Sequence, residues 1–146
     1  RDWNSGYMKR FEDRGGKSLA NRLHVHAASR DEVPGLIGAC DVMLSFIKPA
    51  YSKIASSPTK LAEAFACGIP AICNPGIGDV DTQMESLQAG CLVELTAVTE
   101  PETMRRCLEQ VLPLGGVALR ERAHRRLGLS YAESTYRRVY AELDAP

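Results

Sequence analysis

A lysine and a glutamate stand three residues apart in a stretch that also holds three hydroxyl side chains. Lys60 and Glu63 are spaced to lie on one face of a helix, and Ser56, Ser57 and Thr59 come just before them. Backbone N–H groups at the positive end of a helix bind anions, and phosphate is the anion that best fits them. Lysine adds a cation for a phosphate, and glutamate adds an acceptor for a sugar hydroxyl. These residue types in this order predict a site for a phosphate with a sugar beside it.

The helix that must position these groups is predicted to begin near Pro58. Proline in the first turn of a helix loses no hydrogen bond, and Ser57 before it is expected to cap the helix. Gly68 suits the left-handed residue that ends a helix, and residues 70–73 are typical of a short buried strand. The segment is therefore predicted to be a helix, a turn and a strand of an α/β domain.

Two further turns are expected to contribute to the same site. In open α/β sheets, ligands bind at the carboxyl ends of the strands. A loop at 48–57 follows a predicted strand at 41–47, and a glycine-rich turn follows the strand at 70–73. The candidate residues in this loop and this turn are Lys53, Gly76, Gly78 and Asp79.

Strands and helices are predicted to alternate along most of the chain. The predicted strands are 23–27, 41–47, 70–73 and 91–95. The predicted helices are 29–40, which begins with a capping box at 29–32, then 58–67, 80–88, 101–112, 117–127 and 131–143. Alternation with short connections predicts a single α/β domain over 1–146, with a parallel, doubly wound, Rossmann-like sheet of about four strands.

The composition of the chain is that of an ordinary globular domain. The chain has 146 residues, of which 45% are hydrophobic, and its 18 basic side chains balance its 18 acidic ones, which gives no case for nucleic-acid binding. The five cysteines are widely spaced in apolar segments, so we expect free thiols in a reducing compartment, hence the cytoplasm. No pattern of ligands predicts a metal site.

Six arginines near the carboxyl end of the chain form a basic cluster. We expect a solvated helix face there, and the alternative is a peripheral contact with an anionic membrane surface or a polyanionic partner. The residues are Arg120, Arg122, Arg125, Arg126, Arg137 and Arg138.

The stretch Lys60-Leu-Ala-Glu63-Ala-Phe-Ala-Cys-Gly68-Ile-Pro70 resembles the signature of the retaining glycosyltransferases of the GT-B fold, group 1 or family 4. In that family two glutamates separated by seven residues face the nucleotide-sugar donor, and the second touches the ribose. Glu63 matches the second, and Ala55 stands in the place of the first. The resemblance extends from about residue 23 to residue 143 and includes the Ser-Arg-x-Glu-Val-Pro segment at 29–34 and the turn at 76–79.

The resemblance implies the donor-binding, C-terminal half of a GT-B enzyme, incomplete at its amino end. The whole enzyme would transfer a sugar from a nucleotide-diphosphate sugar to a hydroxyl of a glycan, a lipid or a small molecule, without a metal or other cofactor. Its acceptor-binding first domain would lie outside this chain, so the fragment alone is expected to be inactive. No catalytic residue is identified.

The resemblance also implies that two middle strands of the family's 3-2-1-4-5-6 sheet are missing. Unpaired backbone is not tolerated in a buried sheet. We therefore expect either that the strand at 23–27 moves beside the strand at 41–47, or that a second copy of the chain supplies the missing pairing in a homo-oligomer. Two other functions stay open: a nucleotide-sugar epimerase, which shares the fold, and a non-catalytic binding or assembly module.

Overall fold

A three-stranded parallel sheet lies at the centre of the computed structural model, which describes residues 22, 24 and 27–143. The strands are β1 (Met43–Ser45), β2 (Ala71–Cys73) and β3 (Gly90–Leu92), in the order β1-β2-β3. Helix α5 (Thr59–Ala66) leads from β1 to β2, and α6 (Val80–Leu87) leads from β2 to β3. The predicted α/β class and the parallel sheet with flanking helices are confirmed.

Three of the four predicted strands are present, and each is shorter than predicted. The fourth, at 23–27, lies largely outside the described residues, and its two described members, His24 and Ala27, are not in a strand. The predicted loop at 48–57 contains a single helical turn, α4 (Tyr51–Ile54), which the sequence analysis missed. The remaining elements are α3 (Val33–Gly38), α7 (Pro101–Val111), the 3₁₀ turn η1 (Leu112–Leu114), α8 (Val117–Leu127) and α9 (Leu129–Leu143).

Helix α3 begins later than the capping box predicted. The Glu32 carboxylate accepts hydrogen bonds from the backbone N–H and the hydroxyl of Ser29, both at 2.8 Å. These bonds lower the pKa of Glu32. The expected pair is therefore formed, but it closes a turn that precedes the helix, which starts at Val33 with Pro34 in its first turn.

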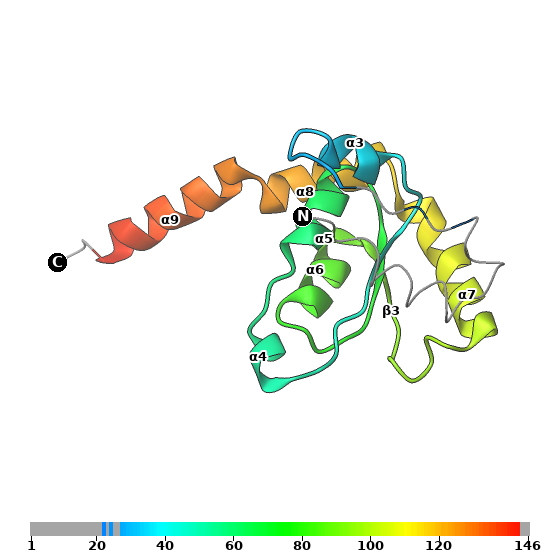
Figure 1. Cartoon of the computed structure of the whole chain (residues 1–146). Coiled ribbons are helices and arrows are strands. Elements are labelled where there is room, and N and C mark those ends of the chain that lie inside the picture. Colours follow the sequence, from blue (N-terminus) through cyan, green and yellow to red (C-terminus); the bar gives the residue numbers. More distant parts are fainter. Residues whose placement is uncertain (1–21, 23, 25–26, 144–146) are drawn as a thin grey trace.

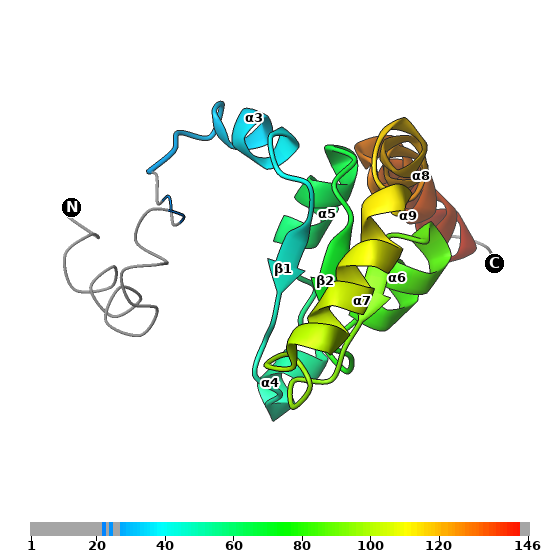
Figure 2. The ribbon, with the colours of Figure 1, turned by 90° about the vertical axis from the view of Figure 1, so that its right-hand side faces the viewer.

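Helices cover the sheet on both faces (Figures 1 and 2). Helices α5 and α6 pack on one face with α8 against both of them, and Leu61, Phe65 and Leu119 are fully buried there. Helix α7 packs on the other face, with Val111 against Ile72 of β2. Every residue of β2 is buried. Among the described strands β1 and β3 are at the two edges, and Leu44 of β1 is 54% exposed because α7 packs on β2 and β3 instead.

The end of α5 is fixed against the start of α8. Gly68 has the predicted left-handed conformation, with φ of +80°, and the N–H of Ile69 donates to the carbonyl of Ala64 at 2.9 Å. The carbonyl of Gly68 accepts from the N–H of Gly116 at 2.7 Å. A Cβ on Gly68 would lie 2.7 Å from the Gly116 carbonyl oxygen, so only glycine allows this approach.

Helix α9 extends away from the rest of the molecule (Figure 1). None of its residues is buried. Apart from Tyr131, its exposed large apolar side chains have helical spacing and form one stripe along the helix. The stripe consists of Leu129, Tyr136, Val139, Tyr140 and Leu143. Within the described part of the chain, no helix is long and apolar enough to cross a membrane.

Asn74 joins the carboxyl ends of β1 and β2. Its side chain is buried, with 2% exposure of the residue. Its Oδ1 atom accepts from the N–H of Ile47 at 2.8 Å, and its Nδ2 atom donates to the carbonyl of Pro75 at 3.2 Å. The amide thus satisfies backbone groups that lie beyond the last residue pair of the ladder, Ser45 and Cys73.

We expect Asn74→Ala to lower the free energy of unfolding by about 1–3 kcal/mol, because the N–H of Ile47 would lose its partner in a partly buried position. Urea unfolding followed by circular dichroism measures this loss. Gln110→Ala, on the exposed side of α7, is the control and should change stability by less than about 0.5 kcal/mol. Equal stability of the two variants would contradict the role given to Asn74.

Arg122 differs from the other members of the basic cluster. Its Nε atom donates to the carbonyl of Leu87 at 2.7 Å, and its guanidinium also reaches the carbonyl of Gln88 at 3.4 Å. These carbonyls end α6, where a positive charge also stabilises the helix dipole. For this one residue, the expectation of a solvated face is wrong.

We expect Arg122→Ala to destabilise the protein by about 1.5 kcal/mol, the scale of a hydrogen bond from a charged group. Arg126→Ala, on the exposed side of the same helix, is the matched control and should be nearly neutral. Thermal unfolding of both variants tests the difference, and a larger loss at Arg126 would contradict it.

Candidate functional site

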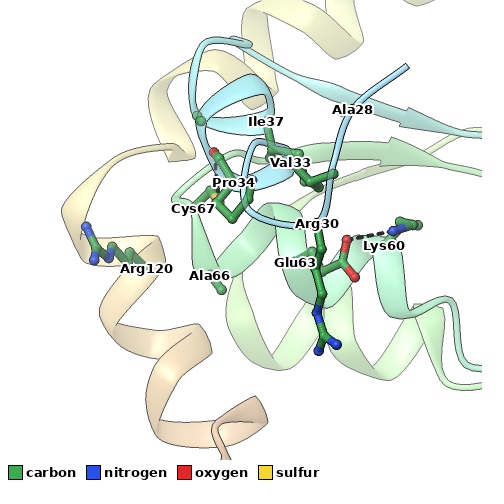
Figure 3. A pocket seen from close by; sticks show the side chains of 12 residues that line it. Ala28, Arg30, Val33, Pro34, Ile37, Lys60, Glu63, Ala66, Cys67 and Arg120 are labelled. Carbon is green, nitrogen blue, oxygen red and sulfur yellow. Dashed lines mark hydrogen bonds and ion pairs between the residues drawn. The ribbon is translucent and has the colours of Figure 1, made fainter. Parts of the chain in front are cut away.

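A groove of about 990 Å³ lies between α3 and α5 (Figure 3). Its α3 wall is apolar and includes Val33, Pro34 and Ile37. Its α5 wall includes Lys60 and Glu63. These two side chains face the groove because Leu61 and Phe65, on the opposite side of α5, are buried against the sheet.

Lys60 and Glu63 form an ion pair inside the groove. Their Nζ and Oε2 atoms are 3.0 Å apart, and the side chains are 66% and 43% exposed. An exposed pair of this kind contributes little to stability, so a ligand can replace it at small cost. The ammonium and the carboxylate each have hydrogen-bonding capacity beyond this contact.

Positive charge predominates along the groove. Among its lining residues the cations are Arg30, Lys60 and Arg120, and the carboxylate is Glu63. In the view of Figure 3, Arg30 lies across the Glu63 side of the groove and Arg120 is at the far end, beyond Ala66. This balance of charge favours an anionic ligand that also carries an apolar part and a hydrogen-bond donor.

The two predicted turns meet at the carboxyl ends of β1 and β2. The Ser57 hydroxyl donates to Oδ2 of Asp79 at 3.0 Å, and the amide of Gln83 donates to the same oxygen at 2.6 Å. Gly78, with φ of +50°, packs its α-carbon against the backbone of Ser56. The two turns therefore lie side by side, but neither contributes a residue to the lining of the groove between α3 and α5.

The predicted capping of α5 by Ser57 is wrong. The residue before the helix is Pro58, and no side chain caps the helix there. Ser57 lies one position too early to cap and donates its hydroxyl to a carboxylate instead, which is a stronger acceptor than a neutral oxygen.

The turn at 76–79 already holds a carboxylate. The N–H of Gly76 donates to both oxygens of Asp81, at 3.2 and 3.1 Å. A phosphate at this N–H would have to displace Asp81 and would also meet the charge of Asp79. At the start of α5 Thr59 is exposed, and the carboxylate that contacts Lys60 is Glu63.

The nine predicted site residues thus fall into groups. Lys60 and Glu63 line the groove, and Thr59 begins the helix that carries them. Lys53 is exposed on α4 and is not among the residues that line the groove. The other five lie in or beside the two turns, and they are Ser56, Ser57, Gly76, Gly78 and Asp79.

Sequence reasoning missed the other wall and the far end of the groove. Arg30, Val33 and Pro34 belong to the Ser-Arg-x-Glu-Val-Pro segment quoted for the resemblance to the glycosyltransferases, and that segment was the one signal that could have found them. Arg120 was assigned to the solvated basic cluster, and no local pattern distinguishes it from its neighbours.

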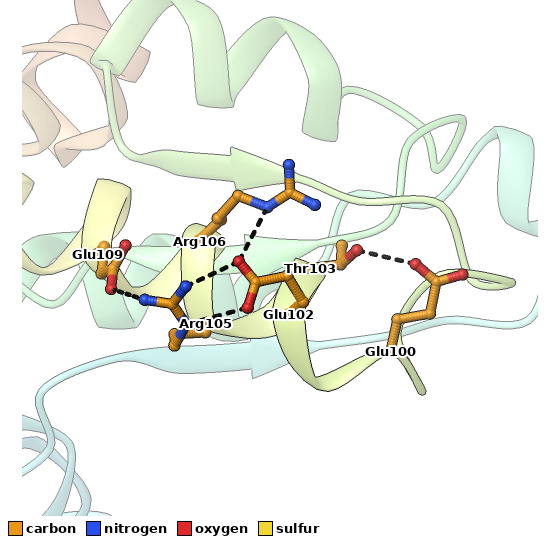
Figure 4. A network of polar contacts seen from close by, with 6 residues as sticks. All are labelled: Glu100, Glu102, Thr103, Arg105, Arg106 and Glu109. Carbon is orange, nitrogen blue, oxygen red and sulfur yellow. Dashed lines mark hydrogen bonds and ion pairs between the residues drawn. The ribbon is translucent and has the colours of Figure 1, made fainter.

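A second group of charges lies on the outer side of α7 (Figure 4). Glu102 contacts Arg105 at 2.8 Å and Arg106 at 3.8 Å, and Arg105 also contacts Glu109 at 2.7 Å. All four side chains are well exposed, so these pairs contribute little energy. Substitutions of these residues serve as controls for substitutions in the groove.

Neither a metal nor a known relative identifies the site. In the part of the chain that the structure describes, no group of three or more histidine, cysteine or carboxylate residues could hold a metal ion. Comparison with protein-family models, curated proteins and solved structures found no match. The groove must therefore be interpreted from its own chemistry.

We expect Gly78→Ala to separate the two turns. A Cβ at Gly78 would overlap the Ser56 carbonyl, so the free energy of unfolding should fall by about 3 kcal/mol or more. Gly76→Ala is the matched control, because Gly76 also has positive φ but its Cβ would enter open space. Its cost should be the backbone strain alone, about 1 kcal/mol. Urea unfolding tests both, and equal losses would mean that the close approach to Ser56 is unimportant.

Proposed function

We propose that this chain binds the nucleotide of a nucleotide-diphosphate sugar and is the Rossmann-like, donor-binding half of a GT-B glycosyltransferase. The observation that carries this proposal is the groove between α3 and α5, with Lys60 and Glu63 on one wall and apolar side chains on the other. The resemblance of residues 60–70 to the retaining family 4 enzymes supports the same function.

The groove suits a nucleoside in size and in chemistry. Its volume of about 990 Å³ is at the upper end of the range for small-molecule sites. Val33, Pro34 and Ile37 offer an apolar surface to a base, while the Glu63 carboxylate can accept hydrogen bonds from ribose hydroxyls. Binding of the ribose would replace the ion pair with Lys60 at little cost.

Lys60 and the first turn of α5 would bind the diphosphate. The helix dipole and a lysine both stabilise negative charge, and such charge grows on the diphosphate as it leaves the sugar. This electrostatic work requires no metal ion. The first domain of a GT-B enzyme would supply the acceptor, whether a glycan, a lipid or a small molecule, so this chain alone would not complete the transfer.

A non-catalytic nucleotide-binding module is the second candidate. Ala55, at the end of α4, occupies the place of the family's first glutamate, which contacts the donor sugar. A site without that contact would still hold the nucleotide through Glu63 and Lys60. Product analysis of the longer protein with its nucleotide sugar separates the cases. Transfer to an acceptor supports the transferase, and an epimerised donor supports an epimerase. The absence of both products supports the module.

Calorimetric titration of the chain with UDP, GDP and ADP tests the proposed site. We expect one nucleotide to bind, and Glu63→Ala to weaken its binding about fivefold to thirtyfold, which corresponds to about 1–2 kcal/mol for a lost hydrogen bond to a charged group. Lys60→Ala should also weaken binding and reduce its dependence on salt, because the lysine meets the phosphates.

Glu109→Ala, in the exposed charge group of α7, is the matched control and should bind like the original chain. Unchanged affinity in Glu63→Ala would place the nucleotide outside the groove. Absence of binding of all three nucleotides at millimolar concentration would overturn the proposal for this chain.

A further inference from the structure

Two cysteines from different elements touch on the α7 side of the sheet. Cys91 is on β3 and Cys107 is on α7, and their Sγ atoms are 3.4 Å apart. Both are free thiols. They are 16 positions apart in the chain, so the packing of α7 on β3, and not the local sequence, brings them together.

The two thiols differ in their access to solvent. Cys91 is half-buried and lines a shallow hollow of about 500 Å³ between α6, β3 and α7. Cys107 is 7% exposed and packs among Ile72, Val93 and Val111. A small reagent can therefore reach Cys91 from the hollow, whereas Cys107 is accessible chiefly to Cys91.

We propose that Cys91 and Cys107 are a modification site, at which a low-molecular-weight disulfide such as oxidised glutathione converts the two thiols into an intramolecular disulfide that joins β3 to α7. The proposal is independent of the function of the groove, which lies on α5, on the opposite face of the sheet.

The reaction proceeds by two exchanges of sulfur. Cys91 loses its proton to water and attacks one sulfur of oxidised glutathione, whose disulfide bond breaks and releases one glutathione thiolate. Cys107 then loses its proton and attacks Sγ of Cys91, which releases the second glutathione thiolate. The two thiolates take up the two protons. The cysteine sulfurs are oxidised, and oxidised glutathione is reduced to two thiols.

The geometry requires a small movement. A disulfide bond is about 2.05 Å long, so the two sulfur atoms must approach each other by little more than 1 Å from their contact. Burial, together with the adjacent Cys107, raises the pKa of Cys91 to about 11. The thiolate is therefore scarce at neutral pH, so the first exchange is slow and the test uses an excess of the oxidising disulfide.

The test uses the chain with Cys40→Ser and Cys67→Ser, which removes the other two thiols that are not buried. After incubation with excess oxidised glutathione, we expect a loss of two hydrogen masses without an added glutathione. Trypsin should then release peptides 61–105 and 107–120 joined by a disulfide. Closure of this loop should raise the melting temperature by roughly 10 °C, and a reducing agent should reverse the gain.

Two variants are the controls. Cys91→Ser and Cys91→Ala in the same background leave Cys73 and Cys107 in place, and neither should give the joined peptides or the gain in melting temperature. A joined peptide in either variant would assign the bond to Cys73 and overturn the proposal. A stable glutathione adduct on Cys91, unreacted thiols, or a disulfide that leaves the melting temperature unchanged or lower would also overturn it.

Discussion

The burial of the middle strand constrains the rest of the molecule. β2 is paired on both edges and buried on both faces, and its residues Ala71, Ile72 and Cys73 have no polar side chain. Such a strand is stable only if apolar side chains cover it from both sides. Helices α5, α6 and α8 cover one side and α7 covers the other. Ala71 and Cys73 of β2 belong to the core on the first side, and Ile72 belongs to the core on the second. The amide of Asn74 then satisfies the backbone where the ladder ends.

The candidate groove follows from this arrangement. Helix α5 must turn Leu61 and Phe65 towards β2, so the residues one position before and two positions after Leu61 point outward. These are Lys60 and Glu63, and α3 packs beside them without covering them. The same helix thus contributes to the core on one side and to the proposed nucleotide site on the other. Its charged side chains neutralise each other until a ligand replaces that contact.

Sequence reasoning succeeded where structure is set by neighbouring residues. The α5-turn-β2 unit and α8 have nearly the predicted bounds, because helical spacing, proline and Gly68 act over a few positions. It failed where a distant segment decides the contact. Ser57 bonds to Asp79, 22 positions away, and Arg122 bonds to Leu87, 35 positions away. No local sequence pattern predicts such long-range hydrogen bonds.

The candidate site was predictable to the same extent. Lys60 and Glu63 were found from their spacing on one helix, and both line the groove. The apolar wall of the groove on α3 was not found, because the sequence of a short helix with no buried residue does not indicate what the helix packs against. The packing of α3 on α5 is a tertiary contact, which only the folded chain contains.

The exposure of helix α9 gives it a lower stability than the rest of the fold. It has 15 residues, none of them buried, which is close to the shortest length at which an isolated helix persists in water. The ion pair between Glu133 and Arg137 at 2.8 Å adds only a few tenths of a kcal/mol. Its helix–coil equilibrium is therefore nearly balanced, and it packs on the rest of the molecule mainly through α8. As the temperature rises, we expect α9 to fray gradually from the end farther from α8, before the sheet and its covering helices unfold.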